Sequence, residues 1–184
     1  MFDGLNRGSQ SQVTMIPDSE TLNCSPDRQG KGTLVLSLGN PLRGDDGVGS
    51  AVLEALIASI CLPENVVLLD GYRGGLLNAL LCQEYGRVIV VDAALLGELP
   101  GSWRRFTLDD ARLAQIDLSS CKTLHNASLA EVLALAEVLN ITLPEIIIYG
   151  IQPGEIEWSL SLSEPVCRII PDVCTAILND LEIN

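Results

Sequence analysis

Four aspartates in this 184-residue chain stand where apolar segments end, a position where binding-site residues are common. The stretch "LGNPLRGDDGVG" places Asp45 and Asp46 side by side just after the apolar run "TLVLSL". Asp70 closes "VVLLD", and Asp92 closes "VIVVD". In open α/β sheets, binding sites form beyond the carboxyl ends of parallel strands. We therefore expect the four carboxylates to gather at one edge of a sheet.

Each of these acids also has a purely structural explanation. Asp45 is placed to cap a helix, and Asp46 would then lie in the first turn, where a negative charge is favourable. Asp70 and Asp92 are placed to accept hydrogen bonds from loop amides. The structural explanation suffices for any one of them alone, but their joint placement at one edge favours a shared function.

The glycine-rich loop that contains Asp45 and Asp46 does not have the pattern of a phosphate-binding loop. It lacks the lysine of G-x-x-x-x-G-K-[ST] and does not fit G-x-G-x-x-G. Two acids at a helix start would also repel a phosphate from that position. The loop suits a cation better, and a nucleotide-binding domain is the weakest of the functions considered.

His125 is the only histidine and stands in "TLHNASLAEVL", before a predicted helix. A single histidine excludes sites that need two or three histidine ligands from one subunit. One imidazole and two carboxylates form a mixed nitrogen and oxygen site that zinc, nickel or a similar divalent ion accepts. Such a site is incomplete, so further ligands must come from another molecule.

The hydrophobic pattern predicts strands that alternate with helices, which is typical of a parallel sheet covered on both faces. We expect an α/β fold, a three-layer α/β/α sandwich with a mostly parallel twisted sheet and one antiparallel or edge strand. Strands are expected at residues 33–38, 65–70, 87–92, 102–108, 145–150 and 156–162, the fourth as the edge or antiparallel strand and the last beside its predecessor. Helices are expected behind Asp45 and over residues 75–86, 128–139 and 166–181.

Composition limits the domain organisation and the partners. Residues 1–32 are rich in Ser, Gly, Asn and Asp and predict a flexible leader, whereas residues 33–184 predict a single catalytic α/β domain. The net charge of −13 disfavours nucleic acid and anionic membranes as partners. No secretion signal or apolar run of spanning length is visible, which predicts a cytoplasmic protein. The six cysteines lack C-x-x-C spacing and are expected to be reduced.

Several motifs together resemble the endopeptidases that mature the large subunit of nickel-iron hydrogenases. The most specific is "GNPLRGDDGVG", followed by "LLDG", "VIVVDA", "LHNASLAEVL" and "YGIQP" in matching order and spacing. The resemblance covers most of residues 34–181. It implies a hydrolase that removes a C-terminal extension from the large-subunit precursor once nickel has been inserted.

The resemblance also implies roles for individual residues. Asp46, Asp92 and His125 match the metal ligands and catalytic residues of that family, with Asn40, Asp45 and Asp70 in support. Nickel would be supplied by the precursor, and zinc or another divalent ion would be a surrogate. Hydrolysis would be of the aspartic type or metal-assisted. A non-catalytic chaperone or metal-binding partner of the same precursor is the alternative.

Overall fold

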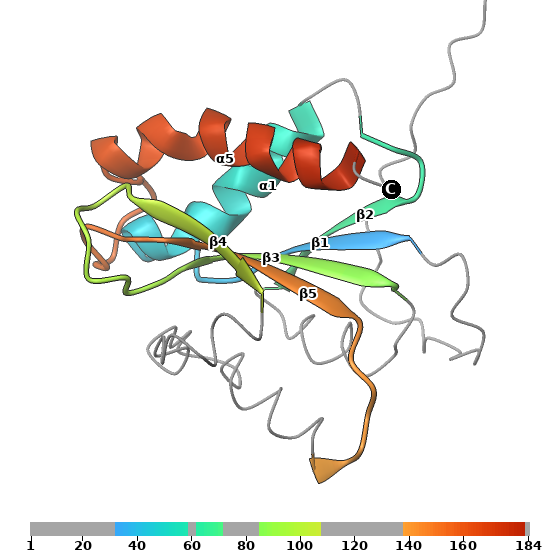
Figure 1. The fold of residues 1–184 in the computed structure, drawn as a ribbon. Coiled ribbons are helices and arrows are strands. Elements are labelled where there is room, and N and C mark those ends of the chain that lie inside the picture. Colours follow the sequence, from blue (N-terminus) through green and yellow to red (C-terminus); the bar gives the residue numbers. More distant parts are fainter. Residues whose placement is uncertain (1–31, 59–61, 72–84, 108–137, 183–184) are drawn as a thin grey trace, which may run out of the picture.

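A five-stranded mixed sheet forms the centre of the fold (Figure 1). The computed structural model describes residues 32–58, 62–71, 85–107 and 138–182. The strands are β1 (Thr33–Ser37), β2 (Val66–Asp70), β3 (Arg87–Ala93), β4 (Trp103–Thr107) and β5 (Glu145–Ile151), in the order β2-β1-β3-β5-β4. All neighbouring strands are parallel except β4, which pairs antiparallel with β5 at the edge. The predicted α/β class, with a mostly parallel sheet and one antiparallel edge strand, is confirmed.

The central strands form where the sequence has uninterrupted apolar runs. Every residue of β1 is buried, as are six of the seven residues in β3 and in β5. Continuous apolar runs rich in Val and Ile are typical of parallel strands that are covered on both faces. Burial of both faces fixes the register. Because β1, β3 and β5 are parallel, their carboxyl ends lie at one edge.

Two helices pack on one face of this sheet, as Figure 1 shows. They are α1 (Val48–Ala58), which follows the short 3₁₀ helix η1 (Gly44–Gly47), and α5 (Glu164–Glu182). In α5 the buried apolar residues recur at helical spacing: Val166, Val173, Ile177 and Leu181. They join Val52 and Leu56 of α1 and the facing strand residues in one hydrophobic cluster.

The other face of the sheet carries a second cluster, which includes Leu36, Val90 and Ile148. All three are 2% exposed or less. The helices predicted over residues 75–86 and 128–139 lie almost wholly outside the described residues, so the expected second helical layer stays a prediction. The leader of residues 1–32 likewise lies outside them, apart from its last residue.

The prediction of a strand at residues 156–162 is wrong. This segment lies in the loop between β5 and α5, and one isolated bridge, between Arg43 and Ser159, is its only β pairing in the described part of the chain. Its alternation of apolar and polar residues has the period of a half-buried strand. Here three of the four apolar members, Ile156, Trp158 and Leu160, are exposed and only Leu162 packs against the core, so the same period arises without a sheet.

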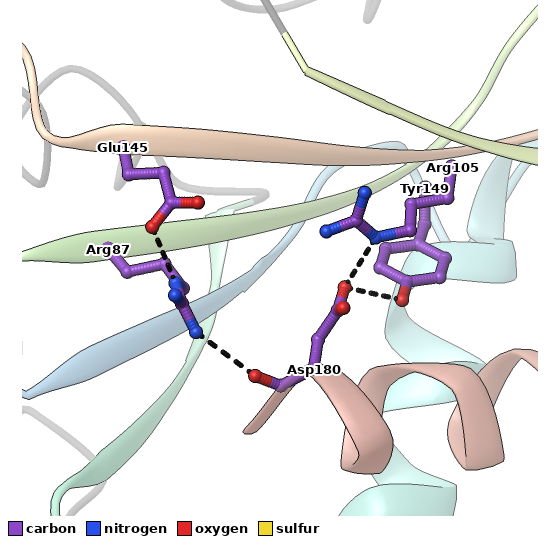
Figure 2. A network of polar contacts seen from close by, with 5 residues as sticks. All are labelled: Arg87, Arg105, Glu145, Tyr149 and Asp180. Atoms are coloured by element: carbon purple, nitrogen blue, oxygen red, sulfur yellow. Dashed lines mark hydrogen bonds and ion pairs between the residues drawn. The ribbon is translucent and has the colours of Figure 1, made fainter. Parts of the chain in front are cut away.

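A polar network attaches the end of α5 to the sheet (Figure 2). The Asp180 carboxylate accepts hydrogen bonds from Arg105 Nε at 2.7 Å and from Tyr149 OH at 2.8 Å. Arg87 donates to the Asp180 carbonyl at 3.0 Å and to the Glu145 carboxylate at 2.8 Å. Burial and the hydrogen bond to Asp180 raise the pKa of Tyr149, so the phenol stays a donor.

None of the helices within the described ranges has the length and apolar character needed to cross a membrane. Of the six cysteines, Cys167 and Cys174 lie in the described part, and both are free thiols.

Candidate active site

The strand order creates a switch point between β1 and β3. The strand that follows β1 in the chain, β2, lies to one side, whereas the strands that follow β3 lie to the other. Crevices form at such points, beyond the carboxyl ends of the strands. Asp46 follows β1, and Asp92 is the next-to-last residue of β3. Two of the predicted site residues therefore flank the switch point.

Close backbone contacts bring the loop of Asp46 onto the ends of both strands. Leu38 N–H donates to the Val91 carbonyl at 2.9 Å, which extends the pairing of β1 with β3. At Gly49, an added Cβ would lie 2.5 Å from the Leu38 oxygen and 2.7 Å from the Val91 oxygen. The start of α1 therefore rests directly on the strand ends, an approach that only glycine permits.

Gly39 makes the sharp turn that places Asp46. Its φ of +101° lies in a region that favours glycine, and an added Cβ would stand 1.8 Å from the backbone oxygen of Asp46. The turn after β1 and the Asp46 backbone are thus packed against each other. The glycines in "LGNPLRGDDGVG" are explained by this packing rather than by phosphate binding.

Asp46 is a buried carboxylate with little hydrogen bonding. It is 7% exposed, and its Oδ2 accepts a hydrogen bond from Asn40 N–H at 2.9 Å. Its Oδ1 accepts none from the described residues. Burial raises the pKa of Asp46, opposed by the Asn40 hydrogen bond and the positive charge of Arg43. A carboxylate with an unused oxygen at a crevice is suited to bind a cation.

Asp45, in contrast, is saturated with hydrogen bonds. Its Oδ2 accepts from Gly154 N–H at 2.8 Å, Glu155 N–H at 3.2 Å and Ser163 Oγ at 2.8 Å. Its Oδ1 accepts from Ser163 N–H at 2.6 Å. Burial alone would raise the pKa of Asp45, but these hydrogen bonds outweigh it and hold the pKa below its ordinary value. Asp45 therefore holds both ends of the β5–α5 loop.

The expectation that Asp45 caps a helix is wrong. Its side-chain partners within the described ranges are all in the β5–α5 loop, and the residue before η1, Arg43, makes no side-chain cap. Capping requires donors from the first turn. The four loop donors are more than 100 residues away in sequence, so local spacing alone does not predict them.

The other predicted site residues of the described segments lie at the same edge. Asp92 is 4% exposed and pairs in register with Gly150 of β5. Asp70 ends β2 and accepts a hydrogen bond from Ser37 Oγ at 3.2 Å. Asn40 is 2% exposed, and its Oδ1 accepts from Leu42 N–H at 2.9 Å, which shapes the loop of Asp46. His125 lies outside the described residues.

Two residues that position the site were not identified from the sequence. Ser163 supplies two of the four donors to Asp45. Gln152 is 8% exposed, and its Oε1 accepts from Leu96 N–H at 2.7 Å and Gly97 N–H at 3.1 Å. Gln152 thereby holds the loop that follows Asp92. Its place in "YGIQP", directly after the apolar strand, was the available signal.

Within residues 32–58, 62–71, 85–107 and 138–182, no three His, Cys, Asp or Glu side chains form a group that could hold a metal ion. The described part of the edge offers carboxylates only. This donor set fits a divalent ion that brings ligands of its own.

Comparison with known proteins shows that this chain is similar to hydrogenase maturation proteins. A family model described as hydrogenase maturation protease matches residues 50–180. The hydrogenase expression/formation protein HupD of Rhizobium leguminosarum bv. viciae is 32% identical over 139 residues, which are 75% of this chain and 68% of HupD.

Solved structures give the same result. The crystal structure of a hydrogenase 2 maturation peptidase from a Thaumarchaeota archaeon is 30% identical, with a TM-score of 0.59 over 84% of this chain and 100% of that one. The solution structure of an endopeptidase from Escherichia coli is 25% identical, with a TM-score of 0.69 over 82% of this chain and 91% of that one.

Proposed function

This chain belongs to the hydrogenase maturation protease family, and on that premise we propose that it removes a C-terminal extension from the large-subunit precursor of a nickel-iron hydrogenase. In this proposal it is an endopeptidase that acts in the cytoplasm on precursor already loaded with nickel. Asp46, Asp92 and His125 are its metal-binding and catalytic residues.

The contrast between the two adjacent aspartates is the observation that carries this proposal. Asp45 accepts four hydrogen bonds and is fully used in holding the loop, whereas Asp46 accepts one from the described residues. Both are buried at the switch point, where a carboxylate without enough donors is costly unless a cation or a proton joins it. Asp46 is therefore the member of the pair that is suited to bind a metal ion.

Nickel enters this proposal as part of the substrate. Asp46 and Asp92 are oxygen donors, and together with one imidazole they leave a divalent ion short of ligands. A nickel ion already held by the precursor would bring the missing ligands with it. Recognition would then require loaded precursor, because neither partner alone supplies a complete coordination shell.

Peptide hydrolysis needs an activated water and a polarised carbonyl. A divalent metal polarises a nearby carbonyl as a Lewis acid. The carboxylates of Asp46 and Asp92 are the groups of this chain placed to accept a proton from water.

Intact-mass measurement of the precursor tests the proposal. Wild-type protein should shorten nickel-loaded precursor by the mass of its C-terminal extension and leave metal-free precursor unchanged. Asp46→Asn keeps the side-chain volume but removes the charge, so processing should fall at least about a hundredfold. Asp172→Asn, the same change at an exposed site in α5, is the matched control and should process normally.

The same measurement separates an enzyme from a chaperone. Stable association with loaded precursor without a change in its mass would contradict the protease and support the non-catalytic alternative. Calorimetric titration adds an independent check. Free protein should bind nickel weakly, and zinc as a surrogate weakly too, whereas tight binding retained in His125→Ala would contradict the proposed ligand set.

A further inference from the structure

The loop between β5 and α5 exposes large apolar side chains. Residues 154–161 are all exposed, and among them Ile156 is 40%, Trp158 77% and Leu160 83% exposed. Single exposed apolar residues need no explanation, but several on one short segment mark an interaction site. Trp is also the residue type that contributes most often to the binding energy of protein interfaces.

This loop is held in place at both ends and in the middle. Asp45 accepts hydrogen bonds from Gly154 and Glu155 at its start and from Ser163 at its end. In the middle, Ser159 N–H donates to the Leu42 carbonyl at 3.1 Å and Gly44 N–H donates to the Ser159 carbonyl at 2.8 Å. A pre-ordered loop loses little entropy when a partner binds, so its exposed side chains are well suited to docking.

Two neighbouring loops lie at the same end of the sheet (Figure 1), and each carries a further exposed apolar residue. Leu42, 43% exposed, follows β1, and Leu99, 80% exposed, lies between β3 and β4. Pro100, next to Leu99, would be 3.3 Å from a Cβ at Gly154. We define the apolar rim as five exposed apolar residues of these three loops: Leu42, Leu99, Ile156, Trp158 and Leu160.

The charges beside the apolar rim indicate the chemistry of its partner. Glu155 and Glu157 alternate with the apolar residues, and neither makes an ion pair within the described segments. The chain as a whole carries a net charge of −13. An acidic partner would be repelled, whereas a segment with Lys or Arg beside apolar side chains would be complementary.

We propose that the apolar rim is the docking surface for a segment of the large-subunit precursor that carries apolar side chains flanked by Lys or Arg. This inference rests on the proposed function and names the part of the surface that recognises the substrate. The rim loop and Asp46 are joined through Asp45, so a precursor bound at the rim is held at a fixed position relative to the site.

Binding and processing kinetics with the nickel-loaded precursor test this proposal. Trp158→Ser and Leu160→Ser should each raise Kd and KM about tenfold and change kcat by less than about twofold, since they remove binding outside the reacting groups. Leu139→Ser is the matched control, because Leu139 is 54% exposed but precedes β5 at the opposite edge. It should behave as wild type.

Charge reversal provides a second variant that leaves the apolar residues intact. Glu157→Lys should raise Kd by about tenfold at low salt and weaken the salt dependence of binding. Wild-type Kd and KM in Trp158→Ser and Leu160→Ser would overturn the docking surface. If wild-type protein leaves the precursor mass unchanged, the proposed function fails, and Kd alone then decides whether the rim docks the precursor.

Discussion

Asp45 at the carboxyl edge of the sheet and Asp180 at the end of α5 each hold distant segments together, but with different partners. Asp45 accepts from three backbone N–H groups and one hydroxyl, all neutral. Asp180 pairs with the guanidinium of Arg105 and the phenol of Tyr149 (Figure 2). The first carboxylate keeps its region negative, whereas the second is neutralised.

The charge of the partners differs because the two regions have different roles. A cation beside Asp45 would compete with any metal for Asp46, the next residue. The donors to Asp45 are neutral and add nothing to the positive charge that Arg43 already places near Asp46, so the edge keeps its attraction for a divalent ion. At the end of α5 no such constraint applies, and an ion pair is sufficient to hold the helix on the sheet.

Among the substitutions of these aspartates, Asp45→Asn should lower the free energy of unfolding most. An Asn side chain can place only one acceptor where Asp45 has two, so at least one buried N–H or hydroxyl would face an amide donor. We expect a loss of about 2–4 kcal/mol in the free energy of unfolding, measured by urea denaturation. Processing should fall as well, because the loop that carries Asp46 loses its attachment.

A helix-capping role for Asp45 would make this substitution mild, since Asn caps nearly as well as Asp. The control is Asp172→Asn, which should change stability by less than about 0.5 kcal/mol. A stability close to wild type for Asp45→Asn would show that the four hydrogen bonds do not hold the loop.

The next largest loss of stability should come from substituting Asp180 at the end of α5. Asp180→Asn weakens the contact with Arg105 but keeps an acceptor for Tyr149, and the Arg105 side chain is 41% exposed. We expect a loss of about 1 kcal/mol in the free energy of unfolding, because exposed ion pairs contribute little. The kcat and KM for precursor should be unchanged. A processing defect without loss of stability would contradict the separation of the two regions.

Asp46→Asn should have the smallest effect on stability of the three substitutions. Burial disfavours the charged form of Asp46, so a neutral isostere should leave the free energy of unfolding within about 0.5 kcal/mol of wild type or slightly above it. This prediction is checked in the same denaturation series. A loss as large as that of Asp45→Asn would show that both aspartates are structural.

The pKa values of Asp45 and Asp46 should also be shifted in opposite directions from the ordinary value of 3.8. The pKa of Asp45 is depressed, so its stabilisation is present above pH 3.8 and is lost as the pH falls through its folded pKa. The pKa of Asp46 is raised, so falling pH between that pKa and 3.8 favours the folded state. Carboxyl ¹³C NMR titration of the free protein should find Asp46 protonated first, and the reverse order would contradict the assignment.

Much of the fold follows from local patterns. The runs that became β1, β3 and β5 are continuous and apolar, and a buried parallel strand has few alternatives at that length. The segment 156–162 was predicted as a strand because alternation reports the periodicity of the residues and not whether they are buried. The distinction required knowing that Ser159 pairs with the loop after β1.

For the site, too, residues with a local signature were predictable and residues that depend on distant partners were not. Asp46 and Asp92 were identified because acids that end strands have a local signature. Ser163 and Gln152 were missed because their roles depend on partners brought together by the fold. The predicted helix cap at Asp45 was wrong for the same reason, since its donors come from residues 154–163.

The long separation between Asp45 and its donors has a consequence for folding. Gly154 and Ser163 lie 109 and 118 residues after Asp45, and contacts of long sequence separation form late because closing a long loop costs entropy. During synthesis from the N-terminus, β1, β2 and β3 emerge well before these donors. The two adjacent aspartates therefore acquire their separate roles only when the last third of the chain has left the ribosome, and the same segment supplies β5, the strand that joins β4 to β3.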